Sequence, residues 1–197
     1  MAKNCVLIAL NSGWKKLQDD TLLFSNMCFG ASDYMNKNNE KCTLIAIDSS
    51  TTSTGYSVFI DNELVEYGCF ELKHIKDTDK RMQKMLLKIF ELIDVYSPKI
   101  IVTEMTVVTR NAKGQRNLTM ILGAIYGYCI QKEIFYFSFR PSEWRKLITE
   151  DKKPRKRDEL KIWSKNKVLE LFNIKDINDD VSDAILVGQA YINKFDE

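Results

Sequence analysis

Two short apolar runs in the sequence each end on a carboxylate. The run TLIAID closes at Asp48, and the run KIIVTE closes at Glu104. Both runs are nearly continuous in apolar residues and rich in β-branched ones, which is typical of strands buried on both faces of a sheet. A sheet buried in this way needs helices on two sides. The runs therefore predict an α/β domain with three layers.

Three further strands are expected around these two runs. GYSVFI and LVEYGCFEL follow the first run and are joined through the turn-forming Asp61 and Asn62, which predicts a three-stranded meander. EIFYFSF at 133–139 is the fifth strand. The pattern therefore favours a five-stranded mixed sheet.

Segments with apolar residues at helical spacing lie between the later strands and after the last one. We expect a helix over 76–97, closed by Ser97 and Pro98, and others at about 117–131, 158–172 and 179–194. Residues 1–40 show no comparable order. We expect them to form an N-terminal extension of unknown role, followed by one domain over residues 41–197.

Composition narrows the classes of function. With 197 residues, 45% of them hydrophobic, the chain is long enough for one domain with a substantial core. His74 is the single histidine, which argues against catalytic triads and histidine-rich zinc sites. The five cysteines form no CxxC pair, and no apolar stretch approaches the roughly 20 residues of a membrane span. We expect a soluble cytoplasmic protein with reduced thiols.

A second pair of acids lies near the end of the sequence, in NDDVSDAILVGQAYI. Asp180 and Asp183 are three residues apart, so they share one face in the first turn of the expected helix. First-turn acids also cap helices and complement the helix dipole, and that structural interpretation stays open for this pair. The small residues Ser182, Ala184 and Gly188 favour close packing of the helix on the sheet.

The four carboxylates are interpreted best as one group. Because the carboxyl ends of parallel strands meet at one edge of a sheet, Asp48 and Glu104 are expected to converge there, with Asp180 and Asp183 above them. Each acid taken alone has a structural explanation. Jointly, like charges in a partly desolvated crevice repel each other unless a cation compensates them. Hard oxygen ligands in this number predict a site for Mg²⁺ or Mn²⁺, with two ions.

These motifs carry a resemblance to a known family. IAIDSSTTSTGYSVF resembles the first motif of RuvC-type Holliday junction resolvases, within the ribonuclease H-like superfamily. IIVTEMTVVTRNA resembles the second motif, LGAIYG the small-residue helix beyond it, and DDVSDAILVG the last motif. The resemblance spans about residues 43–193 and is closer to the phage or poxvirus-like branches, with Ser49 where a glycine is usual.

The resemblance implies a fold, a reaction and a partner. The fold is a ribonuclease H-like three-layer domain. The reaction is that of a crossover junction endodeoxyribonuclease: paired phosphodiester hydrolysis of a four-way DNA junction by a homodimer, leaving 5′-phosphate ends. Carried over by position, Asp48, Glu104, Asp180 and Asp183 are the catalytic metal ligands for two Mg²⁺ or Mn²⁺ ions.

Positive charge is concentrated in one segment. Residues 151–167 carry eight Lys or Arg against three acids, whereas the net charge of the whole chain is +2. Such a segment favours contact with a polyanion, although a solvated lysine-rich loop would look the same. The candidate DNA-binding residues are Arg110, Lys113, Arg116, Lys152, Lys153, Arg155, Lys156 and Arg157. Trp144 either stacks on an opened base or belongs to the core.

Three alternative functions stay open at this stage. Another ribonuclease H-like nuclease, acting on flaps, forks or RNA–DNA hybrids, would share the fold and the metal chemistry. The stretch DSSTTSTGYSVF also resembles the phosphate-binding hairpin of actin-like ATPases and sugar kinases, of which this chain would be a fragment. The last alternative is a non-catalytic nucleic-acid-binding module.

Overall fold

A five-stranded sheet forms the middle layer of the structure, a computed structural model that describes residues 41–106, 111–149, 153–154 and 156–195. The strands lie in the order β3-β2-β1-β4-β5. β1 pairs antiparallel with β2 and parallel with β4, which confirms the mixed sheet. The strands are β1 (Thr43–Asp48), β2 (Ser53–Ile60), β3 (Glu63–Glu71), β4 (Ile100–Glu104) and β5 (Phe135–Phe139).

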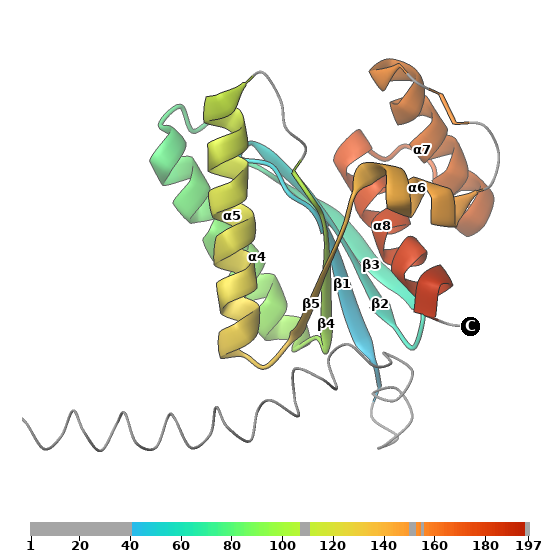
Figure 1. The fold of residues 1–197 in the computed structure, drawn as a ribbon, viewed down its shortest axis with the longest axis horizontal. Coiled ribbons are helices and arrows are strands. Elements are labelled where there is room, and N and C mark those ends of the chain that lie inside the picture. Colours follow the sequence, from blue (N-terminus) through green and yellow to red (C-terminus); the bar gives the residue numbers. More distant parts are fainter. Residues whose placement is uncertain (1–40, 107–110, 150–152, 155, 196–197) are drawn as a thin grey trace, which may run out of the picture. The chain divides into compact units, whose positions relative to one another are not determined.

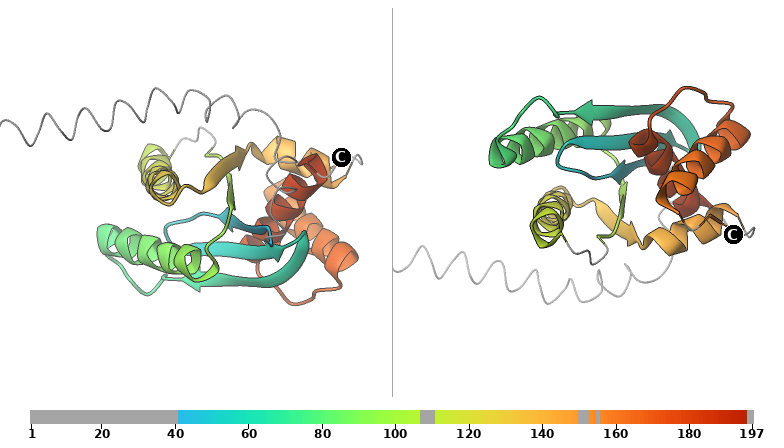
Figure 2. Two further views of the ribbon diagram at one scale, coloured as in Figure 1. Left: turned by 90° about the horizontal axis from the view of Figure 1, so that it is seen from below. Right: turned by 90° about the horizontal axis from the view of Figure 1, so that it is seen from above.

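Helices cover both faces of this sheet, as the three-layer prediction requires. Figure 1 shows one group of helices on each face, and the views in Figure 2 agree. The first pair is α4 (Thr78–Tyr96) and α5 (Ala112–Gln131). The second group is α6 (Pro141–Ile148), α7 (Arg157–Phe172) and α8 (Asp179–Phe195).

The larger part of the core lies between the sheet and the first pair of helices. Asp77 caps α4 by accepting a hydrogen bond from the backbone N–H of Lys80. Met85, Ile89 and Ile93 then recur at helical spacing and are buried against the sheet. Burial of each such side chain contributes about 1.5–3 kcal/mol to folding. This core fixes β1 and β4, which carry two of the candidate carboxylates.

On the other face, α8 approaches the sheet unusually closely. A Cβ atom added at Gly188 would come within 2.4 Å of the Phe59 ring. The Ser57 hydroxyl donates a hydrogen bond to the backbone carbonyl of Ala184, at 2.9 Å. Small residues along α8 therefore permit the approach, which confirms the packing expected from the sequence.

One expectation about the helices was wrong. α5 begins at Ala112, not near residue 117, because the side chain of Asn111 caps it by accepting from the N–H of Gly114. The polar stretch before 117 therefore forms the first turn of the helix. The sequence around Trp144, where no helix was expected, forms the helix α6. Among the helices that the structure describes, none is both long and apolar enough to cross a membrane.

Candidate active site

Asp48 and Glu104 lie side by side at one edge of the sheet. In the parallel register of β1 and β4, Ile47 pairs with Thr103, so the next residue of each strand is a carboxylate. Both side chains face α8, because Ala46, two residues before Asp48, touches that helix at Gly188. The convergence expected from the ends of parallel strands is therefore present.

α8 brings the second pair of acids to the same edge. Asn178 caps its first turn by accepting a hydrogen bond from the N–H of Val181, at 2.8 Å. Asp48 pairs with Gly55 across β1 and β2, and the space beside Gly55 is filled by the backbone carbonyl of Asp180. A Cβ on Gly55 would lie 2.0 Å from that oxygen. Glycine at this position thus lets the helix start directly above Asp48.

The electrostatics show that the carboxyl groups interact. Burial raises the pKa of Asp48 well above its usual value, and the neighbouring Asp183, Glu104 and Asp180 raise it further. Arg145 acts in the opposite direction. Acids from three elements of the fold therefore lie close enough to act on the Asp48 carboxyl group.

Glu104 is held by two residues of α6. The indole N–H of Trp144 donates to Glu104 Oε2 at 2.6 Å, and Arg145 Nη2 lies 3.8 Å from the same oxygen. Burial raises the pKa of the Glu104 carboxyl, while these two neighbours lower it in part. Trp144 itself is 0% exposed, so it belongs to the core and does not present a face for base stacking.

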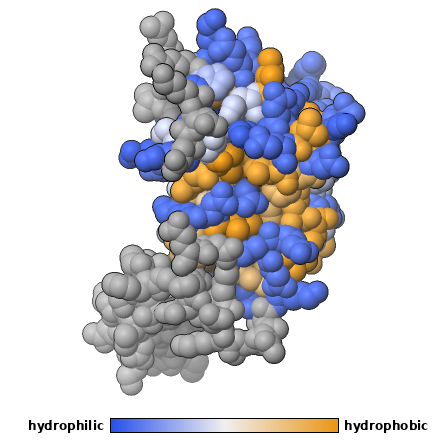
Figure 3. All heavy atoms as spheres, turned by 90° about the vertical axis from the view of Figure 1, so that its right-hand side faces the viewer, coloured by the Kyte–Doolittle hydropathy of each residue, from blue (hydrophilic) through white to orange (hydrophobic). Residues whose placement is uncertain are grey.

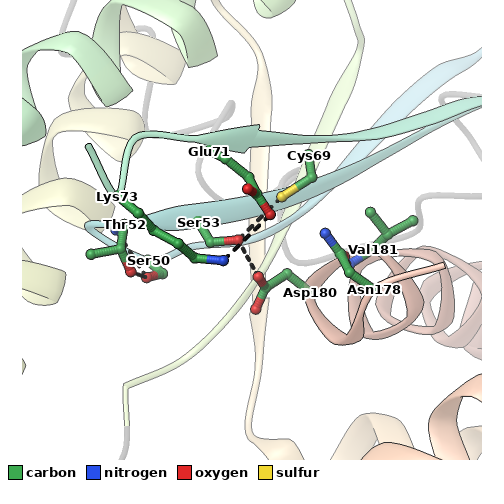
Figure 4. Close-up of polar contacts among 9 residues, drawn as sticks. All are labelled: Ser50, Thr52, Ser53, Cys69, Glu71, Lys73, Asn178, Asp180 and Val181. Atoms are coloured by element: carbon green, nitrogen blue, oxygen red, sulfur yellow. Dashed lines mark hydrogen bonds and ion pairs between the residues drawn. The ribbon is translucent and has the colours of Figure 1, made fainter. Parts of the chain in front are cut away.

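Asp183 and Asp180 bind neighbouring hydroxyl groups. Burial raises the pKa of Asp183, and a hydrogen bond from Ser164 of α7 partly offsets this. One oxygen of Asp183, Oδ1, is buried without a hydrogen-bond partner among the described residues. Figure 4 shows Asp180 pointing toward Ser53 of β2, whose hydroxyl donates to it and lies 3.2 Å from the sulfur of Cys69.

The chemistry of these four carboxylates fits divalent metal ions, although their side chains are not arranged as a complete set of metal ligands. Within the described ranges, no three His, Cys, Asp or Glu side chains are placed so that they could hold an ion together. Glu104, Asp180 and Asp183 each accept a hydrogen bond from a neighbour instead. Hard carboxylate oxygens are the ligands that Mg²⁺ and Mn²⁺ prefer, and a bound cation would relieve the repulsion between these acids.

The candidate DNA-binding residues divide into two groups within the described part of the chain. Lys113 and Arg116 lie near the start of α5 and border a polar groove of about 620 Å³ that Asp77 and Asp79 of the α4 start also border. Arg157 begins α7. Arg110, Lys152 and Arg155 lie outside the described residues.

Several lysines of the basic segment have protein partners. Lys153 donates to the backbone carbonyls of Arg145 and Thr149 at the end of α6, and Lys156 pairs with Glu159. Lys161 and Lys165 of α7 both pair with Asp179, at 2.6 and 2.9 Å. Part of the positive charge therefore satisfies carbonyls at the end of α6 and ties α7 to α8.

Sequence reasoning missed the residues that support the carboxylates. Arg145 faces three of them, and Ser53 and Ser164 donate hydrogen bonds to the acids of α8. The one available signal was the pair Trp144–Arg145 in a short helix between the fifth strand and the basic segment. The two serines gave no signal, because their role depends on how α7 and α8 pack.

Comparisons with known proteins identify the family and the fold. A family model described as "Crossover junction endodeoxyribonuclease RuvC" matches residues 44–190. No curated protein matches the chain by sequence.

Solved structures of three organisms share the fold. Thermus thermophilus RuvC in complex with Holliday junction substrate has a TM-score of 0.61 at 12% identity, covering 77% of this chain and 93% of that one. The yeast mitochondrial Holliday junction resolvase Ydc2 has a TM-score of 0.53 at 12% identity, covering 81% of both chains. Fowlpox virus resolvase, solved with Holliday junction DNA, has a TM-score of 0.54 at 12% identity, covering 77% and 97%.

The family match spans both carboxylate-bearing strands and most of α8, in the order that the fold brings together. It favours a junction nuclease over a fragment of an actin-like ATPase. The chain therefore belongs to the RuvC family of crossover junction endodeoxyribonucleases.

Proposed function

We propose that Asp48, Glu104, Asp180 and Asp183 hold two Mg²⁺ or Mn²⁺ ions and that this site hydrolyses phosphodiester bonds of four-way DNA junctions. The observation that carries the proposal is the position of Asp48, whose half-buried carboxyl group is under the electrostatic influence of the three other acids. Bound at such a site, divalent ions supply an activated water and neutralise charge on the phosphate.

The residues of the chain have separate tasks in this proposal. The four carboxylates supply the oxygen ligands. One of these oxygens, Asp183 Oδ1, accepts no hydrogen bond from any described residue. Arg145 supplies a fixed positive charge facing the acids, which favours approach of a phosphate to this edge. Ser53 and Ser164 orient the acids of α8.

The substrate follows from the family and from the similar structures. The Thermus and fowlpox enzymes were both solved with Holliday junctions, and this chain shares their fold. Lys113 and Arg116 lie at the start of α5, which covers the face of the sheet opposite to α8. The proposed DNA path runs past these two residues and past Arg157 at the start of α7. Arg110, Lys152 and Arg155 belong to this proposed path from their sequence positions alone.

The outer side of α7 is less suited to DNA than its composition suggested. Figure 3 shows hydrophobic side chains exposed between hydrophilic ones on the side of the domain that carries α7 and α8. Ile162, Leu169 and Leu171 of α7 are among the exposed large hydrophobic residues. The proposed phosphate contacts therefore lie at the start of α7 and do not extend along its length.

The proposal includes a homodimer, because two symmetric incisions in one junction require two active sites. The described chain supplies one group of four acids. α5 exposes Met120, Tyr126 and Ile130, whose side chains are 52%, 49% and 61% exposed. An apolar helix face of this kind is suited to burial against its copy. Ile130→Glu is expected to shift the protein to a monomer in sedimentation velocity, whereas Glu133→Gln is expected to leave it dimeric.

A cleavage assay on four substrates tests the proposal. We expect Mg²⁺- or Mn²⁺-dependent, symmetric incision of a four-way junction, and little incision of a fork, a nicked duplex or an RNA–DNA hybrid. Asp48→Asn is expected to abolish incision while junction binding persists, because a metal ligand is lost and no basic surface is changed. Asp94→Asn serves as the matched control, since Asp94 is exposed and pairs with Lys132 on α5. If the hybrid or the fork were cleaved in preference to the junction, the proposed junction substrate would be wrong.

A further inference from the structure

Trp144 places its one polar group against a candidate metal ligand. Its side chain is 0% exposed, and its indole N–H donates to Glu104 Oε2 at 2.6 Å. An indole nitrogen donates a hydrogen bond but does not accept one, and it carries no charge. Trp144 can therefore fix a carboxylate oxygen without competing with that carboxylate for a cation.

The surroundings hold this indole in one place. The guanidinium of Arg145 lies 4.5 Å from the centroid of the Trp144 ring, and the ring of Trp163 lies 6.2 Å away. α6, which carries Trp144, is tied to α8 by a hydrogen bond from Asn193 to the carbonyl of Leu147, at 2.9 Å. The helix that carries the donor is thus joined to α8, which carries Asp180 and Asp183.

We propose that Trp144 is a positioning residue that holds Oε2 of Glu104, directs Oε1 toward the other acids, and thereby sets the affinity of the site for divalent metal. This inference rests on the proposed metal site. Hydrogen-bond donors behind a ligand fix its orientation, and their loss lowers metal affinity or activity about 10- to 100-fold. The bond also links β4, which supplies Glu104, to the helices that supply the remaining ligands.

A purely structural role makes a different prediction. If Trp144 only fills the core, replacing it would lower stability without a specific effect on metal binding. Trp163 provides the matched control because it is a neighbouring indole that lies in the same aromatic pair and makes no hydrogen bond to Glu104 in the structure. Replacement by phenylalanine can be compared at both positions.

The first measurement tests the hydrogen bond in the metal-free full-length protein. In ¹H–¹⁵N spectra, the indole signal that disappears in Trp144→Phe should lie downfield and exchange slowly with solvent. Glu104→Gln should move it upfield, because a neutral amide is a weaker acceptor than a carboxylate. An exposed, rapidly exchanging signal that Glu104→Gln leaves in place would overturn the inference without touching the proposed function.

The second measurement is Mn²⁺ affinity, followed by the electron paramagnetic resonance of free Mn²⁺. Trp144→Phe is expected to weaken binding about 10- to 100-fold, whereas Trp163→Phe stays within about threefold of wild type. If Trp144→Phe does not fold, site-specific benzothienylalanine at 144 keeps the ring and replaces the N–H by sulfur.

The outcomes separate the inference from the function. Equal Mn²⁺ affinity in wild type and in either position-144 variant, together with loss of binding in Glu104→Gln, overturns the role of Trp144 and leaves the metal site intact. Absence of Mn²⁺ binding in the wild type overturns both.

Discussion

Gly55 of β2 lies against the backbone carbonyl of Asp180 so closely that any larger residue would collide with the start of α8. The Cβ of an alanine there would be 2.0 Å from the carbonyl oxygen and 2.8 Å from the backbone nitrogen of Val181. Two backbones are in contact at this point, and neither can move aside as a side chain would. The position of two candidate ligands therefore depends on a residue that has no side chain.

We expect Gly55→Ala to reduce cleavage at least about 100-fold, since misplacement of reacting groups by about 1 Å has effects of that size. Gly68→Ala is the matched control, because the atoms nearest to its methyl group would be those of the Tyr56 side chain. Cleavage per folded molecule, corrected by circular dichroism, is the measurement. Equal activity of the two variants would contradict the claim that Gly55 positions α8.

Asp48→Asn is expected to stabilise the metal-free protein at high pH. The raised pKa of Asp48 means that the folded state retains a proton that the unfolded chain has already released. Stability therefore falls as pH rises from the ordinary carboxyl range through the raised pKa, and the amide removes this loss. At about pH 8 and in the presence of a chelator, the free energy of unfolding of the variant should exceed that of the wild type by about 1 kcal/mol or more. This corresponds to an increase of roughly 2–4 °C in melting temperature.

The same comparison at about pH 5 should show a smaller difference, because the carboxyl group is then protonated more often in both states. A variant less stable than wild type at the higher pH would show that Asp48 is not under repulsion from its neighbours.

Arg81 of α4 is expected to control the loop that follows Asp48. Its guanidinium donates from Nε to the carbonyl of Thr51 and from Nη1 to that of Ile75, both at 2.8 Å. Arg81→Met removes both bonds and leaves two carbonyls to find other partners, which should cost about 1–3 kcal/mol in the free energy of unfolding. Lys84→Met is the control, because it removes the same charge at an exposed position of the same helix. The free energy of unfolding, measured by urea denaturation, should change little in this variant.

Lys113 and Arg116 are expected to contact phosphates. Replacing either by glutamine should weaken junction binding to a similar degree for all sequences and lower the slope of log K against log salt by about 1. Lys153→Gln provides the comparison, since its ammonium binds carbonyls at the end of α6. Its salt slope should match wild type, while its thermal stability falls. An unchanged slope in the first two variants would remove the start of α5 from the DNA path.

The sequence predicted those parts of the site that depend on strands. Asp48 and Glu104 could be placed because buried apolar runs locate parallel strands, and the ends of such strands meet. Asp180 and Asp183 could be placed because helical spacing puts both on one face. These predictions needed only the local period of the chain and the order of its elements.

The remaining features depend on tertiary packing. Trp144 carried two open interpretations, and its bond to Glu104 follows from how α6 crosses the end of β4. Lys153 looked like a phosphate ligand because charge counts do not reveal that an ammonium group lies beside exposed helix carbonyls. The early start of α5 was hidden by polar residues, since a cap such as Asn111 is recognised by geometry more than by composition.

The proposed metal site can be located by anomalous diffraction from crystals grown with Mn²⁺. We expect anomalous difference peaks between the carboxylates of Asp48, Glu104, Asp180 and Asp183, and their loss in Asp48→Asn. Peaks at other positions only, with Glu104, Asp180 and Asp183 still accepting hydrogen bonds from Trp144, Ser53 and Ser164, would show that the four acids do not form the metal site.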